Sequence, residues 1–293
     1  MKIAAIAYQI ERLADWAAHS EKLDKLITDA DADLIVLPEY AAIEAALIDG
    51  PVGGSAQDWR DRASDVAHDW VNQFRTAAQR HNVHIVAGSG PVKTRRGVVN
   101  RSWLIAPSGN VLHQDKMILT PFERDDMGMI AGDNLRVFHT ALGVMGILIC
   151  YDSEFPLLAR ALTAAGAEVL LVPAATDFAA GQTRVRQSCR ARAIENQCLV
   201  VHAPLVGNVA DCDVVAQSNG RAALFCPPDT GLPEDGIIAQ GPAQQAGAVV
   251  ADVDPNAIAA ARYNGQVGNF THWQEQDSRL YPVTLQQMDP INP

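Results

Sequence analysis

The stretch GILICYDSEFPLLARALTAAGAEVLLVPAA, residues 146–175, contains a complete strand–helix–strand pattern. The apolar run that ends at Cys150 predicts a buried strand, and residues 154–166 predict a helix that ends at Gly166. A second apolar run, AEVLLVPAA, predicts another buried strand. Strands that alternate with helices in this way are typical of an α/β protein.

The same alternation extends in both directions from this stretch. Residues 1–9 and 83–90 predict strands, and residues 15–30 and 57–81 predict helices. The sequence VVNRSWLIAP-SGN-VLHQDKM predicts a hairpin that turns at residues 108–110. Helices and hairpins together predict an α/β fold with a mixed sheet. We expect one domain, because the two halves look alike and no low-complexity linker separates them.

The composition narrows the classes of function. The chain has 293 residues, of which 48% are hydrophobic, and a formal net charge of −11. An acidic surface repels phosphate groups, so we expect neither a nucleic acid nor an anionic membrane as a partner. No apolar run approaches the roughly 20 residues that a membrane span requires. The five cysteines, an odd number without CxxC spacing, predict neither a disulfide framework nor a zinc site, and they favour a cytoplasmic location.

Polar side chains that can carry chemistry stand at the ends of separate apolar runs. Glu39 closes LIVLPE, Lys116 closes VLHQDK and Cys150 closes MGILIC. In open α/β sheets, reacting groups gather outside the carboxyl ends of the strands. A carboxylate, an ammonium and a thiol in such a crevice would form a site, although chain order alone does not bring them together.

Cys150 has a functional and a structural interpretation. A thiol at a strand-to-helix turn can feel the positive end of the helix and lie open to a substrate, whereas most cysteines in apolar runs are packing residues. An ordinary thiol, with a pKa near 8.5, needs activation at neutral pH. None of the eight histidines stands beside a strand end with convincing turn signals, so a carboxylate such as Glu39 would have to be the base.

The neighbouring charged residues also have ordinary alternatives. Lys116 could supply positive charge to an oxyanion, or it could be a surface lysine. Glu123 follows seven residues later on an expected loop, where it could orient a substrate amine or lie on the surface. No HExxH motif, cluster of His and Cys ligands or Walker loop is present, so the sequence predicts no metal and no cofactor.

Four blocks of sequence resemble the nitrilase superfamily of carbon–nitrogen hydrolases. They are LPEY (37–40), DKMILTPFE (115–123), GILICYDSEFP (146–156) and RARAIENQCLVV (190–201), and they occur in the order and spacing of that family. The resemblance covers residues 1–270. It implies a four-layer α-β-β-α sandwich as one domain over 1–270. The last stretch, 271–293, is polar, and we expect it to be an extension that packs on the domain or on a partner subunit. The resemblance also implies a homodimer or a larger homo-oligomer.

The resemblance assigns roles to the site residues. It implies that Glu39, Lys116 and Cys150 form a catalytic triad that cleaves an amide through a thioester. The Lys116 ammonium and the backbone N–H of Tyr151 would bind the oxyanion. Glu123 matches a further glutamate of many family members.

The substrate class is less sharply defined. The pair Tyr151-Asp152 after the cysteine is similar to amidase-like members, whereas nitrilases tend to have Trp-Glu there. We therefore expect hydrolysis of a small amide, of the amidase or ω-amidase type. The alternatives are nitrile hydrolysis, N-carbamoyl hydrolysis, acyl transfer at the same site, and a non-catalytic binding protein on this fold.

Overall fold

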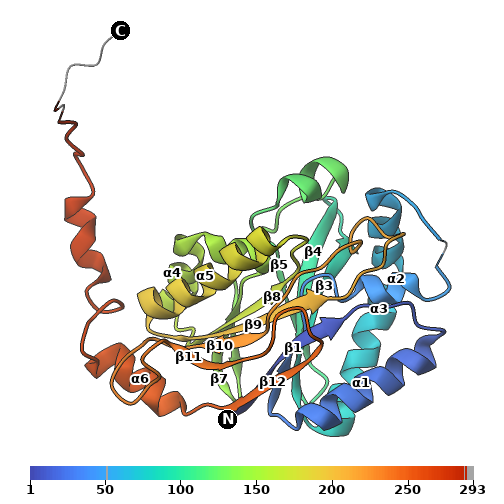
Figure 1. The fold of residues 1–293 in the computed structure, drawn as a ribbon, viewed down its shortest axis with the longest axis horizontal. Coiled ribbons are helices and arrows are strands. Elements are labelled where there is room, and N and C mark those ends of the chain that lie inside the picture. Colours follow the sequence, from blue (N-terminus) through green and yellow to red (C-terminus); the bar gives the residue numbers. More distant parts are fainter. Residues whose placement is uncertain (51, 287, 289–293) are drawn as a thin grey trace.

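The computed structural model describes residues 1–50, 52–286 and 288. In it, strands form the middle of the molecule, helices α1 and α3 lie on one side, and α4 and α5 lie on the other (Figure 1). The strands follow the order β5-β4-β3-β2-β1-β9-β8-β7-β6. The predicted combination of parallel strands and hairpins is therefore present.

The first half of the chain supplies one side of this arrangement. Strands β1, β2 and β3 pair in parallel, and β3, β4 and β5 pair as antiparallel neighbours. The helices follow the strands in the alternation that the sequence predicts. The elements are β1 (Lys2–Gln9), α1 (Trp16–Ala30), β2 (Leu34–Val36), α2 (Ile43–Leu47), α3 (Ala56–His81), β3 (His84–Lys93), β4 (Val98–Ile105) and β5 (Val111–Asp115).

The second half supplies the other side. Strands β7, β8 and β9 are parallel, while β6 and β10 pair as antiparallel neighbours at β7 and β9. The main elements are β6 (Val137–Thr140), β7 (Gly143–Ile147), α4 (Pro156–Ala164), β8 (Val169–Ala174), α5 (Ala179–Asn196) and β9 (Leu199–Val206). The later elements are β10 (Ala223–Phe225), β11 (Ile237–Gln240), β12 (Gly247–Asp252) and α6 (Pro255–Asn264).

Strand β1 joins the two halves and is buried on both faces. It pairs with β9 through Tyr8↔Leu205 and Gln9↔Val206. Ile3 and Ala5 belong to the core shared with the second half, whereas Ala4 and Ile6 belong to the core beneath α1 and α3. Because side chains alternate along a strand, the continuous apolar run IAAIA gives each core its own face of β1.

Two predicted boundaries differ from the structure for local reasons. The strand expected to end at residue 90 continues to Lys93, because its last residues pair with Val98–Arg101 of β4. Within this strand, Gly88 adopts a φ of +67°. A Cβ at Gly88 would lie 2.3 Å from the carbonyl oxygen of Pro38, so only glycine permits this close approach. The helix expected from residue 154 begins at Pro156, because Cys150–Glu154 forms a 3-10 turn before it.

The C-terminal segment starts on the body and then leaves it. The Arg160 guanidinium lies 4.0 Å from the centroid of the Trp273 ring, which anchors the 3-10 turn Trp273–Arg279. Beyond this turn, Tyr281 and Leu285 are 85% and 92% exposed, and the chain runs away from the body (Figure 1). The predicted packing of 271–293 stays a prediction, and residues 287 and 289–293 of that extension lie outside the described residues.

No helix within the described ranges is both long enough and apolar enough to cross a membrane.

Candidate active site

Glu39, Lys116 and Cys150 lie where short turns follow three strands. Glu39 stands in the turn after β2, Lys116 directly follows β5, and Cys150 opens the 3-10 turn after β7. Cys150 has a φ of +48°, a left-handed conformation that is uncommon for a residue with a side chain. The turn after β7 therefore holds the thiol in a strained, defined position.

Lys116 is the centre of a buried charged cluster. Its Nζ lies 2.8 Å from Glu39 Oε1, and it lies 2.8 and 2.7 Å from Glu123 Oε1 and Oε2. The side chains of all three residues are at most 2% exposed. The alternatives in which Lys116 and Glu123 lie on the surface are therefore wrong.

Glu123 belongs to a π-helical turn rather than to the expected loop. The turn spans Phe122–Asp126. The Glu123 carboxylate also accepts hydrogen bonds from the backbone N–H and the hydroxyl of Thr120, at 2.8 and 3.0 Å. A π-helical turn is rare and occurs frequently at functional sites. Here it points Glu123 into the interior beside Lys116.

Burial and neighbouring charges shift the pKa values of Glu39 and Glu123 in opposite directions. Burial raises the pKa of Glu39 and the charge of Glu123 adds to it, although Lys116 opposes both. Burial also acts to raise the pKa of Glu123, but Lys116 outweighs it and holds that pKa below its ordinary value. Burial acts against the ammonium of Lys116, yet the two carboxylates raise its pKa above the ordinary value. Lys116 is thus a permanent cation, and Glu39 is the carboxylate better suited to accept a proton.

The surroundings of the Cys150 thiol favour its protonated form. Burial raises its pKa well above the ordinary value, and the Glu39 carboxylate adds to this effect. The thiol donates a hydrogen bond to the carbonyl oxygen of Ala175 at 3.4 Å, while the N–H of Ala175 donates to Glu39 Oε2 at 3.0 Å. The expected influence of a helix end does not make a resting thiolate, so attack requires a base that takes the proton as the bond forms.

Sequence reasoning missed several residues that hold this cluster. The Tyr40 hydroxyl donates to Glu123 Oε1 at 2.7 Å, and Asn100 Nδ2 lies 2.9 Å from Glu39 Oε1. Tyr40 stands directly after Glu39, which is a weak signal in the sequence. Asn100 interrupts the apolar strand β4, and a polar residue at such a position is the clearer signal.

Asp152 ties the lysine turn to the cysteine turn. Its buried carboxylate accepts hydrogen bonds from the backbone N–H groups of Met117 at 3.1 Å, Ile118 at 2.8 Å and Ile149 at 3.1 Å. Burial raises the pKa of Asp152 to about 7, against the effects of Lys116 and these N–H groups. Because the donors flank Lys116 and Cys150, the position of one residue depends on that of the other.

A cavity of about 270 Å³ opens onto these groups. Glu39, Lys116 and Cys150 contribute to its wall, and so does Tyr151, whose ring packs edge-on against Phe155 at a centroid distance of 4.9 Å. Glu154 and Arg184 form an ion pair of 3.4 Å at this wall. The remaining wall comes mainly from the segment that enters the π-helical turn and the segment that leads from β8 into α5, through Thr120, Pro121, Phe122, Ala175, Thr176, Asp177, Phe178, Ala180 and Gly181.

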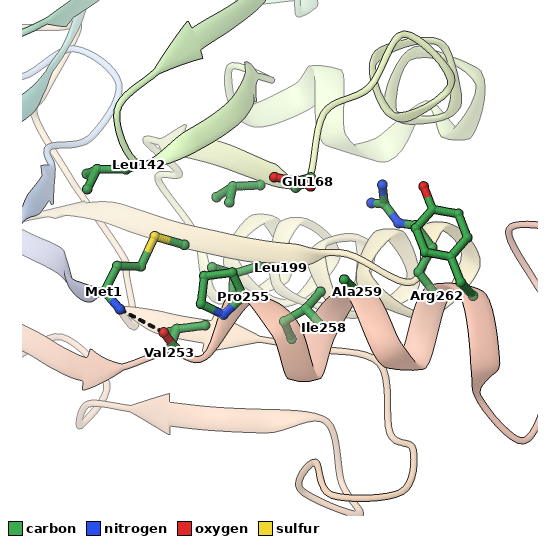
Figure 2. Close-up of a pocket in the computed structure, with 11 residues that line it drawn as sticks. Met1, Leu142, Glu168, Leu199, Val253, Pro255, Ile258, Ala259 and Arg262 are labelled. Carbon is green, nitrogen blue, oxygen red and sulfur yellow. Dashed lines mark hydrogen bonds between the residues drawn. The ribbon is translucent and has the colours of Figure 1, made fainter.

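A second hollow lies at the opposite ends of the strands (Figure 2). There the Met1 ammonium donates a hydrogen bond to the carbonyl oxygen of Val253 at 2.9 Å, and Ile258 and Arg262 of α6 form part of the wall. Its volume of about 20 Å³ has room for about one water molecule. This hollow therefore has no room for an organic substrate, unlike the cavity at Cys150.

The carbon–nitrogen hydrolase family model matches residues 2–263. This chain belongs to the carbon–nitrogen hydrolase family. The predicted membership of the nitrilase superfamily is confirmed.

Two curated relatives and one solved structure illustrate the likeness. The probable hydrolase YhcX of Bacillus subtilis is 30% identical over 91% of this chain and 52% of its own length, so the chain spans about half of that relative. The deaminated glutathione amidase of Synechocystis is 30% identical over 83% of this chain and 87% of its own length. The crystal structure of a carbon–nitrogen hydrolase from Helicobacter pylori matches with a TM-score of 0.75 at 17% identity, covering 96% of each chain. At that identity the match concerns the fold, and the predicted α-β-β-α sandwich is confirmed.

Proposed function

We propose that this carbon–nitrogen hydrolase cleaves the C–N bond of a small amide through a thioester on Cys150. The observation that carries the proposal is the buried contact of 2.8 Å between Lys116 Nζ and Glu39 Oε1, beside a thiol that opens onto a cavity. A base, a fixed positive charge and a nucleophile are the parts that acyl transfer requires.

In the first half of the reaction, Cys150 Sγ attacks the amide carbon while Glu39 accepts the thiol proton. The oxygen of the tetrahedral intermediate carries a negative charge, which the Lys116 ammonium and the backbone N–H of Tyr151 stabilise. Glu39 then gives its proton to the leaving nitrogen, the C–N bond breaks, and ammonia or an amine departs. The acyl group remains on sulfur as a thioester.

In the second half, water replaces the amine. Glu39 takes a proton from the water as its oxygen attacks the thioester carbon, and the same proton returns to sulfur when the C–S bond breaks. The products are a carboxylic acid and the free thiol. The raised pKa of Glu39 suits a group that accepts and returns a proton near neutral pH. Glu123, with its lowered pKa, remains an anion that holds Lys116 in place.

An amide is favoured over the alternative substrates. The Synechocystis relative bears the name deaminated glutathione amidase, and the pair Tyr151-Asp152 resembles amidase-like members. Nitrile hydrolysis, N-carbamoyl hydrolysis and acyl transfer would use the same groups, and they are the alternatives to test alongside. The Cys150 thiol, which stands beside a buried carboxylate at the wall of an open cavity, argues against a non-catalytic binding protein, because the arrangement provides a nucleophile, a base and space for a substrate.

The test measures ammonia release and acyl adducts together. The protein is incubated with short-chain and dicarboxylic ω-amides and the matched nitriles, and intact-protein mass spectrometry follows the adduct on wild type and Cys150→Ala. Ammonia from an amide, with an adduct that Cys150→Ala lacks, supports the proposal. Turnover of nitriles alone would show that the substrates are nitriles rather than amides. A Cys150 that neither amides nor iodoacetamide modify would favour the alternative of a non-catalytic binding protein.

We also propose a cytoplasmic homo-oligomer. All five cysteines are free and buried, which suits a thiol-reducing compartment.

Leu157 of α4 and Ile194 of α5 are 70% and 40% exposed, and the C-terminal segment exposes Tyr281, Val283 and Leu285. These apolar side chains would be covered if two copies packed through their helical faces. Sedimentation velocity on the full chain and on a chain that ends at residue 279 tests this, and a monomeric full chain would contradict it.

A further inference from the structure

Asn100 occupies an unusual position between the two buried carboxylates. Its side chain is fully buried on β4, and Nδ2 lies 2.9 Å from Glu39 Oε1 and 3.1 Å from Glu123 Oε1. Lys116 Nζ lies 2.8 Å from each of the same two oxygens. The two Oε1 atoms are therefore bridged twice, once by an ammonium and once by a neutral amide.

The backbone of Asn100 adds a third link to the site. Its carbonyl oxygen accepts a hydrogen bond from the Lys116 N–H at 2.8 Å. Its side-chain Oδ1 is buried and has no hydrogen-bond partner among the described residues. The amide orientation is nevertheless well determined, because the opposite orientation would place an oxygen against two carboxylates. The residue thus leaves one acceptor unsatisfied in order to direct both N–H donors at the glutamates.

The charges around Asn100 explain why two donors are needed there. Glu39 and Glu123 are two negative charges that share one positive charge, and two close carboxylates raise the pKa of one of them. The other groups that face the cluster are Cys150, beside Glu39, and Tyr40, which donates to Glu123. An amide that donates to both carboxylates stabilises their ionised forms without adding a charge.

We propose that Asn100 is a positioning residue that keeps Glu39 ionised and directed at Cys150 by bridging it to Glu123. This inference rests on the proposed amide hydrolysis, in which ionised Glu39 takes the thiol proton. Without the bridge, the cluster binds a proton at a higher pH, and the fraction of enzyme with a working base falls. The affected pKa belongs to the coupled pair of glutamates rather than to one of them.

The test compares pH profiles of kcat/KM for wild type, Asn100→Leu and Asn100→Ser. Leucine has a similar shape and no donor, and serine is polar but too short to bridge both carboxylates. The matched control is Ser102→Ala on the same strand, because Ser102 is buried and its hydroxyl has no hydrogen-bond partner among the described residues. We expect the acid limb to move up by about one pH unit in both Asn100 variants, with a plateau loss of about tenfold or more, and not to move in Ser102→Ala.

A second readout does not depend on the amide. The rate at which iodoacetamide alkylates Cys150, followed by intact mass against pH with Cys150→Ala as background, reports the same proton transfer. An unmoved limb in both Asn100 variants, even with a uniform loss of rate, would overturn the inference and leave the proposed function intact. If wild type hydrolyses no amide but its alkylation limb still moves in the variants, the substrate proposal fails and the role of Asn100 stands.

Discussion

Two carboxylate–lysine clusters among the described residues, one at Lys116 and one at Lys22, differ in their surroundings, and the cluster at Lys116 borders the cavity beside Cys150. At the candidate site, Lys116 contacts two glutamates and is 1% exposed. In the other cluster, Nζ of Lys22, a residue of α1, lies 2.7 Å from Glu44 Oε1, and the Lys22 side chain is 18% exposed. Burial raises the pKa of Glu44 as it raises that of Glu39. A perturbed buried glutamate is therefore not by itself a sign of catalysis.

The two clusters differ in what surrounds the carboxylate. Glu44 accepts hydrogen bonds from the Tyr8 hydroxyl, from Lys22 and from the N–H of Glu11, and no nucleophile is among these partners. Glu39 instead stands beside the Cys150 thiol at the wall of a cavity. A neighbouring thiol and an open cavity, rather than a pKa shift, therefore distinguish Glu39 from Glu44.

The largest expected effects come from the nucleophile and its base. Cys150→Ser and Glu39→Gln should each lower kcat by about ten-thousandfold or more, because each removes a step that the other groups cannot replace. Ammonia release measures the loss, and circular dichroism with thermal melting checks that the fold persists. Near-normal turnover by Glu39→Gln would contradict the proposal that Glu39 is a catalytic base and Glu44 is not.

Loss of the shared cation should be the next largest effect. Lys116→Met should lower kcat by about a hundredfold to a thousandfold, because the oxyanion loses its positive charge. The variant also leaves Glu39 and Glu123 buried without a counterion, which raises both pKa values above those of the unfolded chain. Since the unfolded chain then releases these protons first as pH rises, the variant should be less stable at pH 8 than at pH 5 in urea titrations. Equal stability at both pH values would contradict the described charge balance.

A substitution of Asp152 tests whether the turns that carry Lys116 and Cys150 need a fixed separation. In Asp152→Asn, an amide N–H group would face a backbone N–H group, so we expect kcat to fall by about tenfold while KM changes by less than about threefold. Steady-state kinetics measure the two constants separately. Asp69→Asn, an exposed position on α3, is the control and should match wild type. A change confined to KM would show that Asp152 acts on substrate binding instead.

Glu44→Gln should show the reverse of Glu39→Gln. We expect a loss of about 2 to 3 kcal/mol in the free energy of unfolding, because Lys22 loses its buried partner, with kcat within about twofold of wild type. Urea unfolding and ammonia release on the same preparation provide both numbers. A large loss of turnover with normal stability would show that Glu44, like Glu39, acts in catalysis.

The smallest expected effect is a loss of stability in acid. Burial lowers the pKa of His19, in the core beneath α1 and α3, to about 4. The unfolded chain binds a proton near pH 6.5, so the stabilising contribution is complete above that pH and is lost as pH falls toward 4. Between pH 7.5 and pH 5 this histidine should cost about 2 kcal/mol, measured by urea unfolding. His19→Phe, which keeps an aromatic ring beside Trp70, should remove that part of the pH dependence, and an unchanged dependence would contradict the assignment.

The positions of the three predicted catalytic residues could be read from the sequence because each one ends an apolar run. Such runs depend on neighbouring residues, and the strands that they form put Glu39, Lys116 and Cys150 in turns at strand ends. The family blocks supplied the expectation that these turns meet.

The contacts that support those residues could not be read in this way. Asn100 and Glu39 are 61 positions apart, and Tyr40 and Glu123 are 83 apart, so no local pattern relates them. The π-helical turn that buries Glu123 was expected to be a loop, because a turn of that kind has no simple periodicity in the sequence.

The sequence by itself determined the order of the strands and helices, because alternating and helical periodicities are properties of neighbouring residues. It also determined which side chains stand at the strand ends. Only the tertiary structure decided that Glu39 has a raised pKa and Glu123 a lowered one, because burial and charge come from groups that separate strands bring together. The difference between Glu39 and Glu44 has the same origin, since both are glutamates that follow apolar sequence and only their surroundings differ.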